Sequence, residues 1–194
     1  MSISLVAGLG NPGRDYERSR HNLGWVVLDA YASKHGLSWK GAPEFDSVVA
    51  RRDLGPGRTL WLVKPQTFMN DSGRAVSAMA RYHRIAAADV AAVYDDLTID
   101  TGLLKVSVSG SDAGHNGVAS LLEHLGTGFA RLRLGIGPRF PPEMDLKDFV
   151  LARFTQEQLT LIQQKTDAYV HALELLIASG PDMAMNQLNR RDTT

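Results

Sequence analysis

The sequence contains no cysteine. Disulfide bonds, thiolate nucleophiles and metals held by cysteine are therefore excluded from its chemistry. The absence of cysteine also fits a reducing compartment, and we expect a cytoplasmic protein.

Long apolar runs and an excess of charge are missing as well. No apolar run approaches the roughly 20 residues that span a bilayer. The chain does not open on a basic segment followed by an apolar stretch of signal-peptide length, so we expect a soluble protein with no membrane partner. The 21 Lys and Arg residues balance the 21 Asp and Glu residues, so the overall charge predicts no partner.

What is present suits one large domain. The 194 residues, 44% of them hydrophobic, suffice for a full core, and we expect a single domain over residues 1–194. Apolar runs bounded by turn residues predict strands over 3–7, 47–52, 59–63, 90–94, 103–108 and 131–136. Helical spacing and stop signals predict helices over 23–35, 72–83, 116–125, 156–178 and 183–188.

The order of these elements predicts the fold class. Strands interleaved with helices favour a single-domain α/β fold, with helices on both faces of a twisted, mostly parallel β-sheet. Gly55-Pro56-Gly57 lies between two predicted strands as a hairpin turn. That hairpin makes the predicted sheet mixed.

A glycine-rich turn, Gly8-Leu9-Gly10-Asn11-Pro12-Gly13, follows the first predicted strand. It matches the G-x-G-x-x-G pattern of dinucleotide-binding proteins, in which a helix opens at the third glycine and holds the pyrophosphate. Here the next helix begins near Asn22, Pro12 removes one N–H, and Asp29 falls inside a helix. We therefore interpret the glycines as a tight turn that presents Asn11.

Three further polar clusters each end or follow an apolar run: Lys64 to Asn70, Asp95-Asp96, and Gly114-His115-Asn116-Gly117. Together with Asn11 and His21 they supply amides, an imidazole and a carboxylate. A neutral imidazole can deprotonate water, a carboxylate can orient it, and amides can hold an oxyanion. The sequence thus favours hydrolysis of an acyl bond without a metal ion or a covalent nucleophile.

Other hydrolytic sites have less support. No H-x-x-x-H or H-E-x-x-H spacing predicts zinc, and no G-x-S-x-G elbow predicts a serine nucleophile. Asp95-Asp96 could bind Mg²⁺, although amides or water would have to supply its other ligands. We predict neither a metal ion nor a cofactor.

Two histidines and two arginines have positions that suit function. His21 and His115 follow glycine-rich loops beside asparagines, whereas the other four histidines lie in or next to predicted helices. Arg131 and Arg133 alternate with apolar residues and share one face of a strand. That face is either a phosphate-binding stripe or the solvated side of a half-buried strand.

Taken together, these segments resemble the bacterial peptidyl-tRNA hydrolase family. The residues that carry the resemblance span most of the chain: GLGNPGRDYERSRHNLG (8–24), KPQTFMNDSG (64–73), VYDDLT (93–98), AGHNG (113–117), RLRLGIG (131–137), DFVLARF (148–154) and AMNQLN (184–189). The resemblance implies a monomeric α/β domain. It also implies hydrolysis of the ester between a peptide's C-terminus and the 3′-terminal ribose of tRNA, which recycles peptidyl-tRNA released from ribosomes.

Matching motif positions imply a role for each site residue. His21 is then the general base, Asp95 its partner, and the amides that position substrate and oxyanion are Asn11, Asn70 and Asn116. The resemblance further implies substrate binding by Tyr16, Phe68, Met69, Lys105 and Arg133, the last two at the tRNA backbone. Two departures stand out, because the family commonly has Asp at the position of Thr98 and some members carry a basic residue near Ser107.

A non-catalytic RNA-binding relative of the same fold is the competing interpretation. Such a protein would tolerate the loss of His21 or Asp95, and this chain keeps both.

Overall fold

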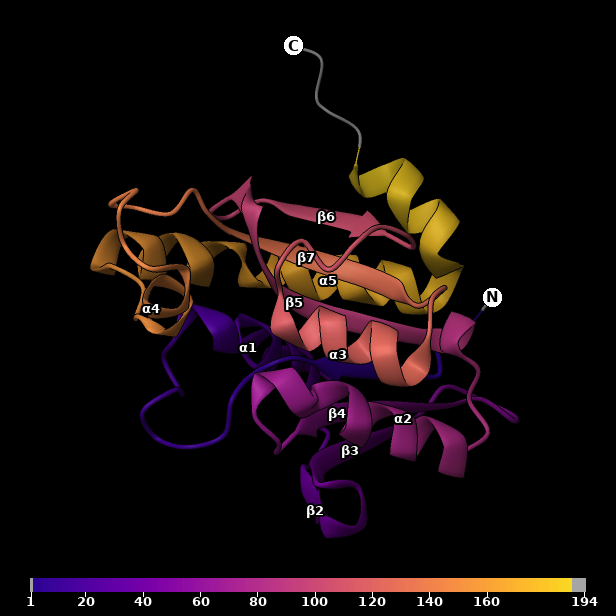
Figure 1. Ribbon diagram of the computed structural model, residues 1–194. Coiled ribbons are helices and arrows are strands. Elements are labelled where there is room, and N and C mark those ends of the chain that lie inside the picture. Colours follow the sequence, from indigo (N-terminus) through magenta and orange to yellow (C-terminus); the bar gives the residue numbers. More distant parts are fainter. Residues whose placement is uncertain (1, 190–194) are drawn as a thin grey trace.

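Seven strands form one mixed sheet in the order β2-β3-β4-β1-β5-β7-β6 (Figure 1). Their bounds are β1 Leu5–Gly8, β2 Lys40–Ala42, β3 Ser47–Asp53, β4 Thr59–Pro65, β5 Val90–Asp100, β6 Leu104–Ser107 and β7 Ala130–Gly137. This computed structural model describes residues 2–189. Residue 1 and residues 190–194 of the predicted domain lie outside that range.

The sheet has a parallel centre and antiparallel edges. Strands β4, β1, β5 and β7 pair in parallel, whereas β2 with β3, β3 with β4, and β6 with β7 are antiparallel. The predicted mixed sheet is thereby confirmed. The predicted hairpin joins β3 to β4, and its glycines adopt positive φ, 116° at Gly55 and 73° at Gly57, a region that glycine tolerates best.

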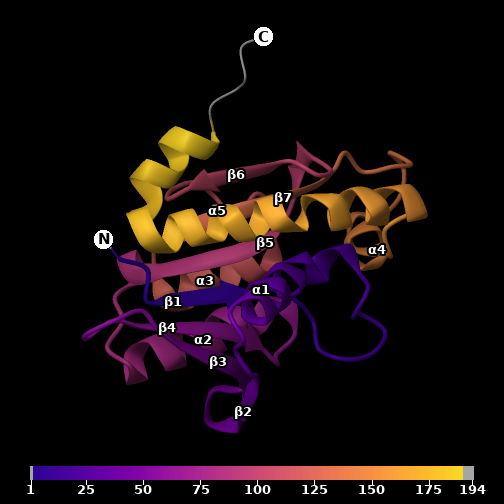
Figure 2. The same cartoon turned by 180° about the vertical axis from the view of Figure 1, so that it is seen from behind.

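Helices cover both faces of the sheet, as predicted. Their bounds are α1 Leu23–Lys34, α2 Ser72–Tyr82, α3 Asn116–Leu125, α4 Leu146–Leu151 and α5 Gln156–Leu188. Helices α2 and α3 lie on the face toward the viewer in Figure 1, and α1 and α5 lie on the opposite face in Figure 2. Helix α5 is interrupted at Gly180, where φ is 77° and ψ is 172°, between the two helices that the sequence predicts there.

The two sheet faces bury separate apolar cores. Val6 of β1 packs into the core under α1 and α5, while its neighbours Leu5 and Ala7 pack under α2 and α3. This alternation follows from the two-residue period of a strand. A parallel sheet covered on both faces requires apolar residues on both, and all four β1 residues are buried.

The carboxyl ends of the parallel strands meet at one edge of the sheet, where α/β proteins bind ligands. Helix α1 approaches this edge closely, because a Cβ on Gly24 would lie only 2.3 Å from the carbonyl oxygen of Val93. The 3-10 helix Arg20–Asn22, which precedes α1, is thereby held beside β5. No helix within residues 2–189 combines the length and the apolar character needed to cross a membrane.

Candidate active site

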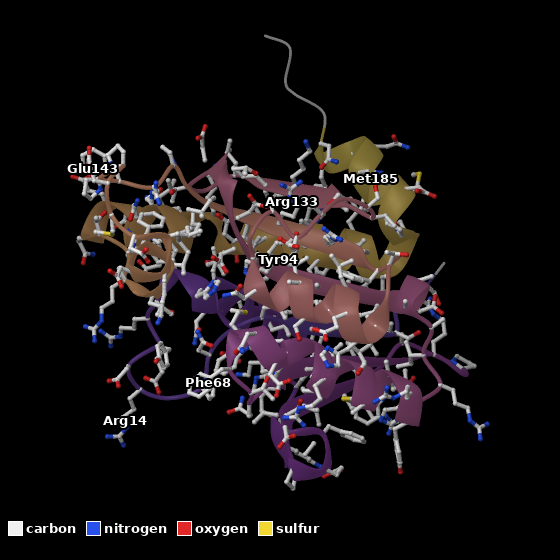
Figure 3. All side chains as sticks on the ribbon, in the orientation of Figure 1. Arg14, Phe68, Tyr94, Arg133, Glu143 and Met185 are labelled. Atoms are coloured by element: carbon white, nitrogen blue, oxygen red, sulfur yellow. The ribbon has the colours of Figure 1, made fainter. Side chains whose placement is uncertain are left out.

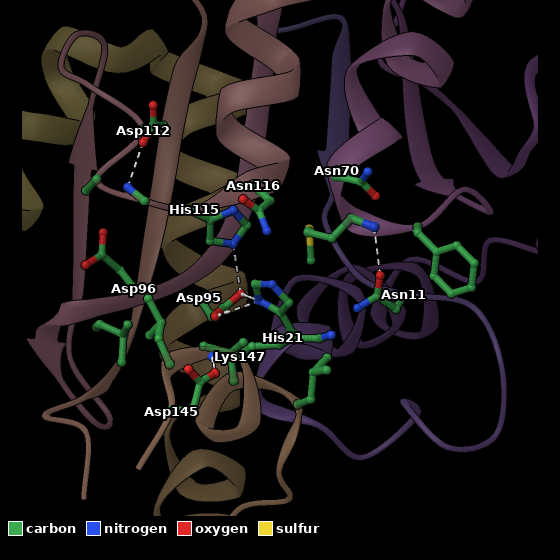
Figure 4. A pocket seen from close by; sticks show the side chains of 18 of the residues that line it. Asn11, His21, Asn70, Asp95, Asp96, Asp112, His115, Asn116, Asp145 and Lys147 are labelled. Atoms are coloured by element: carbon green, nitrogen blue, oxygen red, sulfur yellow. Dashed lines mark hydrogen bonds and ion pairs between the residues drawn. The ribbon is translucent and has the colours of Figure 1, made fainter. Parts of the chain in front are cut away.

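A cavity of about 850 Å³ opens at the carboxyl edge of the parallel strands (Figure 4). Its walls come from the turns after β1 and β4, from β5, from the start of α3 and from α4. The predicted site residues that line it are Asn11, Tyr16, His21, Phe68, Met69, Asn70, Asp95 and Asn116. Segments far apart in the sequence therefore converge on one cavity, whereas Lys105 and Arg133 lie outside its lining.

The His21 imidazole is paired with the Asp95 carboxylate. His21 Nδ1 lies 2.9 Å from Asp95 Oδ1 and 3.0 Å from Oδ2, and both residues are buried. A carboxylate only accepts hydrogen bonds, so Nδ1 carries the proton and Nε2 holds the lone pair. Burial alone would favour the neutral acid, but the two facing imidazoles outweigh burial and hold the pKa of Asp95 well below its usual range.

His115 shares the same carboxylate. Its Nε2 lies 3.1 Å from Asp95 Oδ1, and its Nδ1 accepts hydrogen bonds from the main-chain N–H groups of Gly117 and Val118 as the N-cap of α3. The lone pair of Nδ1 is thus engaged, and Nε2 must carry the proton that Asp95 accepts. Of the two imidazoles, only His21 retains an available lone pair.

Hydrogen bonds hold both the side chain and the main chain of Asn11. Its Oδ1 accepts a 2.7 Å hydrogen bond from the Met69 N–H, which leaves Nδ2 as the available donor (Figure 4). The Asn22 side chain clamps the Asn11 main chain, accepting from its N–H at 2.8 Å and donating to its carbonyl at 2.9 Å. The sequence predicted Asn11 but not Asn22, since nothing in the motif shows which amide supports the other.

Two amides lie at the cavity mouth. Asn70 follows Met69 in the 3-10 helix after β4, and Asn116 is the first residue of α3. Both are exposed. Exposed amides at a cavity mouth can donate and accept hydrogen bonds without any change of protonation.

The cavity wall next to Asn11 is formed by the apolar and aromatic side chains of Met69, Phe68 and Tyr16. Met69 is buried, and a Cβ on Gly117 would lie 2.5 Å from its sulfur, so glycine at 117 makes room for Met69. Phe68 is 59% exposed, and its ring meets Tyr16 edge-on with centroids 6.3 Å apart. An exposed aromatic at a cavity is typical of a binding surface.

The second carboxylate of the acidic pair faces away from the histidines. Arg133 Nε donates to Asp96 Oδ2 at 2.8 Å, and the Thr98 hydroxyl donates to Asp96 Oδ1 at 2.6 Å. Burial opposes ionisation of Asp96, but these hydrogen bonds prevail and lower its pKa. The two carboxylates therefore hold separate partners, and Figure 4 shows Asp96 pointing away from His21 and His115. This arrangement does not favour the magnesium alternative. Thr98 bridges Asp96 and Arg133, since it also accepts from Arg133 Nη2 at 3.2 Å.

The predicted stripe of two arginines is wrong for Arg131. Its side chain is buried and donates to the carbonyls of Gly110 and Ser111 at 2.8 Å each. The loop over residues 110–113 crosses this end of the strand and removes the guanidinium from solvent. The basic pair at the sheet edge is instead Lys105 and Arg133, which are register partners across β6 and β7; Figure 3 labels Arg133.

Metal-ligating atoms gather at one place within residues 2–189. Donor atoms of His21, Asp95 and His115 lie within 4.8 Å of one another and could hold a metal ion. The sequence does not predict this group, because its members come from three distant segments and not from one helix. In the geometry observed, the same atoms form hydrogen bonds around Asp95, an arrangement suited to proton transfer.

The chain resembles proteins of known activity along nearly its whole length. A family profile described as peptidyl-tRNA hydrolase matches residues 5–194. The chain is 43% identical over 190 residues to peptidyl-tRNA hydrolase of Anaeromyxobacter sp. (strain K), with 97% of each chain covered. It is 42% identical over 189 residues to the enzyme of Desulfitobacterium hafniense (strain Y51), with 97% of this chain and 100% of the relative covered.

A solved structure gives the same result. The crystal structure of peptidyl-tRNA hydrolase from Acinetobacter baumannii matches with a TM-score of 0.88 and 33% identity, over 96% of this chain and 94% of that one. Fold and relatives together define a hydrolase of aminoacyl-tRNA esters. The chain belongs to the peptidyl-tRNA hydrolase family, and its activity is the hydrolysis of peptidyl-tRNA.

Proposed function

We propose that His21 is the general base of this hydrolysis. The observation that carries the proposal is that Asp95 occupies Nδ1 of His21, which leaves the Nε2 lone pair on a residue that lines the cavity. Nε2 removes a proton from water as the water attacks the ester carbonyl, and Asp95 stabilises the imidazolium that forms. His115 donates to Asp95 and has no free lone pair for the same task.

The amides complete the site in this proposal. The Asn11 Nδ2 group donates to the oxygen on which negative charge develops. Asn70 and Asn116, at the mouth, position the attacking water and the 3′-terminal ribose. The apolar surface of Met69, Phe68 and Tyr16 receives the peptide.

Contact with the tRNA backbone falls to the basic pair at the sheet edge. Lys105 is exposed and lies opposite Arg133 in the register. The Asp96 carboxylate pairs with Arg133, so the two basic side chains together present one uncompensated positive charge near the cavity. This local pair supports a nucleic-acid substrate even though the chain as a whole is neutral. We further propose a monomer that forms a single domain, because all the proposed catalytic groups in the cavity come from one chain.

Replacement of the base tests the proposal. His21→Ala should lower kcat by at least about 10²-fold, since general-base catalysis contributes roughly 10²–10⁴-fold, with little change in tRNA affinity. Single-turnover hydrolysis and filter binding measure the two quantities. His124→Ala, on the outer part of α3, is the matched control and should keep wild-type activity. Near-normal turnover of His21→Ala would exclude His21 as the base and direct attention to His115.

A further inference from the structure

Arg20 stands immediately before His21 in the same 3-10 helix, and only 5% of it is exposed. Its Nη1 donates to the carbonyl oxygens of Arg153, at 2.8 Å, and Phe149, at 3.3 Å. Its Nη2 donates to Gln158 Oε1 at 2.9 Å. One side chain thus joins the turn that carries His21 to the end of α4 and the start of α5.

No carboxylate of residues 2–189 lies within ion-pair distance of this guanidinium. The guanidinium stacks on the Phe149 ring, 4.2 Å from its centroid, and lies 5.4 Å from that of Phe154. Burial lowers the pKa of Arg20, yet an arginine stays charged in proteins. The carbonyl oxygens of Phe149 and Arg153 and the amide oxygen of Gln158 balance that charge at Nη1 and Nη2, whereas Arg20 Nε has no hydrogen-bond partner among residues 2–189. A buried charge is costly without such partners, so the position must be held accurately for it to be stable.

The main chain repeats the connection. The Arg20 N–H donates to the carbonyl of Ala152 at 3.0 Å, and Ser19 forms an antiparallel bridge with Arg153. The turn that carries His21 is therefore fastened to the end of α4 by both side-chain and main-chain hydrogen bonds.

Helix α4 also forms a wall of the cavity. Leu146, Lys147, Val150 and Leu151 line it, and Leu146 is 37% exposed. The surface that faces the substrate and the surface that grips Arg20 thus belong to one short helix.

We propose that Arg20 is a positioning residue that couples the α4 wall to His21. A peptide that binds against α4 fixes the position of that helix. The hydrogen bonds of Arg20 then fix the position of the His21 imidazole relative to α4, so that Nε2 is aligned with the ester. This inference rests on the proposed role of His21 as base. It assigns Arg20 no contact with substrate.

Arg20→Lys tests the coupling, because lysine keeps the charge but cannot reach three acceptors with a planar fork. We expect kcat to fall about tenfold or more, as misplacement of a reacting group does, with KM within about twofold of wild type. The Nδ1–H proton signal of His21 in the NMR spectrum should shift or broaden, which a defect remote from His21 would not cause. Glu174→Gln is the matched control, since it removes the negative charge that α5 presents to Lys34 and His35 and should leave kcat and the signal unchanged.

A double-mutant cycle tests whether α4 is the element that Arg20 couples to His21. Leu146→Ala should lower kcat in the wild-type background and much less in Arg20→Lys, whereas Phe68→Ala, on the turn after β4, should lower kcat by the same factor in both backgrounds. Additive behaviour with Leu146→Ala, or wild-type kcat and an unchanged His21 signal in Arg20→Lys, would overturn the inference.

A milder variant guards against loss of folding. Gln158→Leu removes one of the three acceptors of Arg20, together with the hydrogen bond from the Thr155 N–H at the start of α5. The value of kcat should fall severalfold with the same change in the His21 signal; wild-type values would again contradict the coupling. Failure of the proposed function is separately visible, because His21→Ala would then still hydrolyse peptidyl-tRNA.

Discussion

At the scale of single residues, one buried carboxylate organises the site. Asp95 accepts from both His21 and His115, and the two rings lie 4.8 Å apart. In the proposed mechanism only His21 is the base, because the N–H groups at the start of α3 occupy Nδ1 of His115. The two histidines differ in their hydrogen-bond partners and not in their burial. Hydrogen-bond partners cannot be read from the sequence, so the sequence analysis could not separate the two candidates by this criterion.

Asp95→Asn should reduce kcat but leave residual activity, because the water and the Asn11 donor remain. Removal of the anion beside Nδ1 makes the charged imidazole less favourable, so protonation of the base requires a lower pH. The acidic limb of the pH profile of kcat should therefore move to lower pH. Asp96→Asn is the matched control and should leave the limb in place, because Asp96 faces Arg133. A shift in Asp96→Asn alone would reverse the assignment of the pair.

Arg133→Ala should weaken tRNA binding more than the chemical step. Loss of one phosphate contact lowers the slope of log K against log salt by about 0.7–0.9, and a titration of KM with salt measures it. Lys105→Ala should behave similarly, since it removes the neighbouring charge. Weaker binding with an unchanged slope in Arg133→Ala would mean that Arg133 serves only to hold Asp96 and Thr98.

The predicted site residues divide according to what the sequence can reveal. Asn11 and His21 could be proposed because motifs at strand ends meet at one edge of a sheet, whereas Met69 was implied only by the resemblance to the family. The burial of Arg131 and the role of Arg20 could not, because both depend on segments distant in sequence, residues 110–111 and 149–158. An arginine in an alternating strand looks the same whether solvent or a loop covers it.

At the scale of elements, those with sharp boundary signals are predicted best. Helix α3 spans Asn116–Leu125, the bounds predicted from the sequence, and it lies between a glycine-rich segment and Gly126. Strand β5 continues to Asp100, past the predicted end at residue 94, because its last part is polar and is stabilised by pairing with β7 instead of by apolar burial. The short edge strand β2 was not predicted, since two of its three residues are exposed.

The crossing of α2 and α3 requires a glycine. A Cβ on Gly73 would lie 2.0 Å from the Ser120 carbonyl oxygen, and the Gly73 N–H donates to Ser120 Oγ at 2.9 Å. Gly73→Ala should therefore lower the free energy of unfolding by about 1–3 kcal/mol, the range for overpacking, as measured by urea denaturation. Gly41→Ala, where a Cβ meets nothing within 4 Å, should change it by less than about 0.5 kcal/mol. Equal effects of the two would show that the helices separate easily.

At the scale of the whole molecule, the net charge of zero does not show that two basic residues lie together at one place. The charges balance over the sequence, yet Lys105 and Arg133 are adjacent on one sheet edge beside the cavity. The order of strands and helices along the sequence predicts the α/β class. The net charge does not predict the basic pair, because that pair depends on the antiparallel register of β6 and β7.

The stability of the whole molecule should fall at alkaline pH, and Tyr169 of α5 is one cause. Its hydroxyl is buried without a hydrogen-bond partner among residues 2–189, and burial raises the pKa of Tyr169 to about 12. The folded state then keeps a proton that the unfolded state releases near pH 10. The contribution of this proton to the free energy of unfolding is fully present below about pH 10 and is lost as the pH rises toward about 12.

Tyr169→Phe removes both the titration and the unpartnered hydroxyl. Near neutral pH the variant should be more stable by about 1 kcal/mol, since the desolvation cost of the hydroxyl disappears. Between about pH 10 and 12 its stability should decline less than that of wild type, by up to about 2 kcal/mol. Part of the decline should persist, because burial also raises the pKa of Tyr31 and Tyr94. Urea denaturation at a series of pH values measures these differences, with the exposed Tyr82→Phe as control. An alkaline decline as steep in Tyr169→Phe as in wild type would show that this hydroxyl finds a partner when the protein is folded.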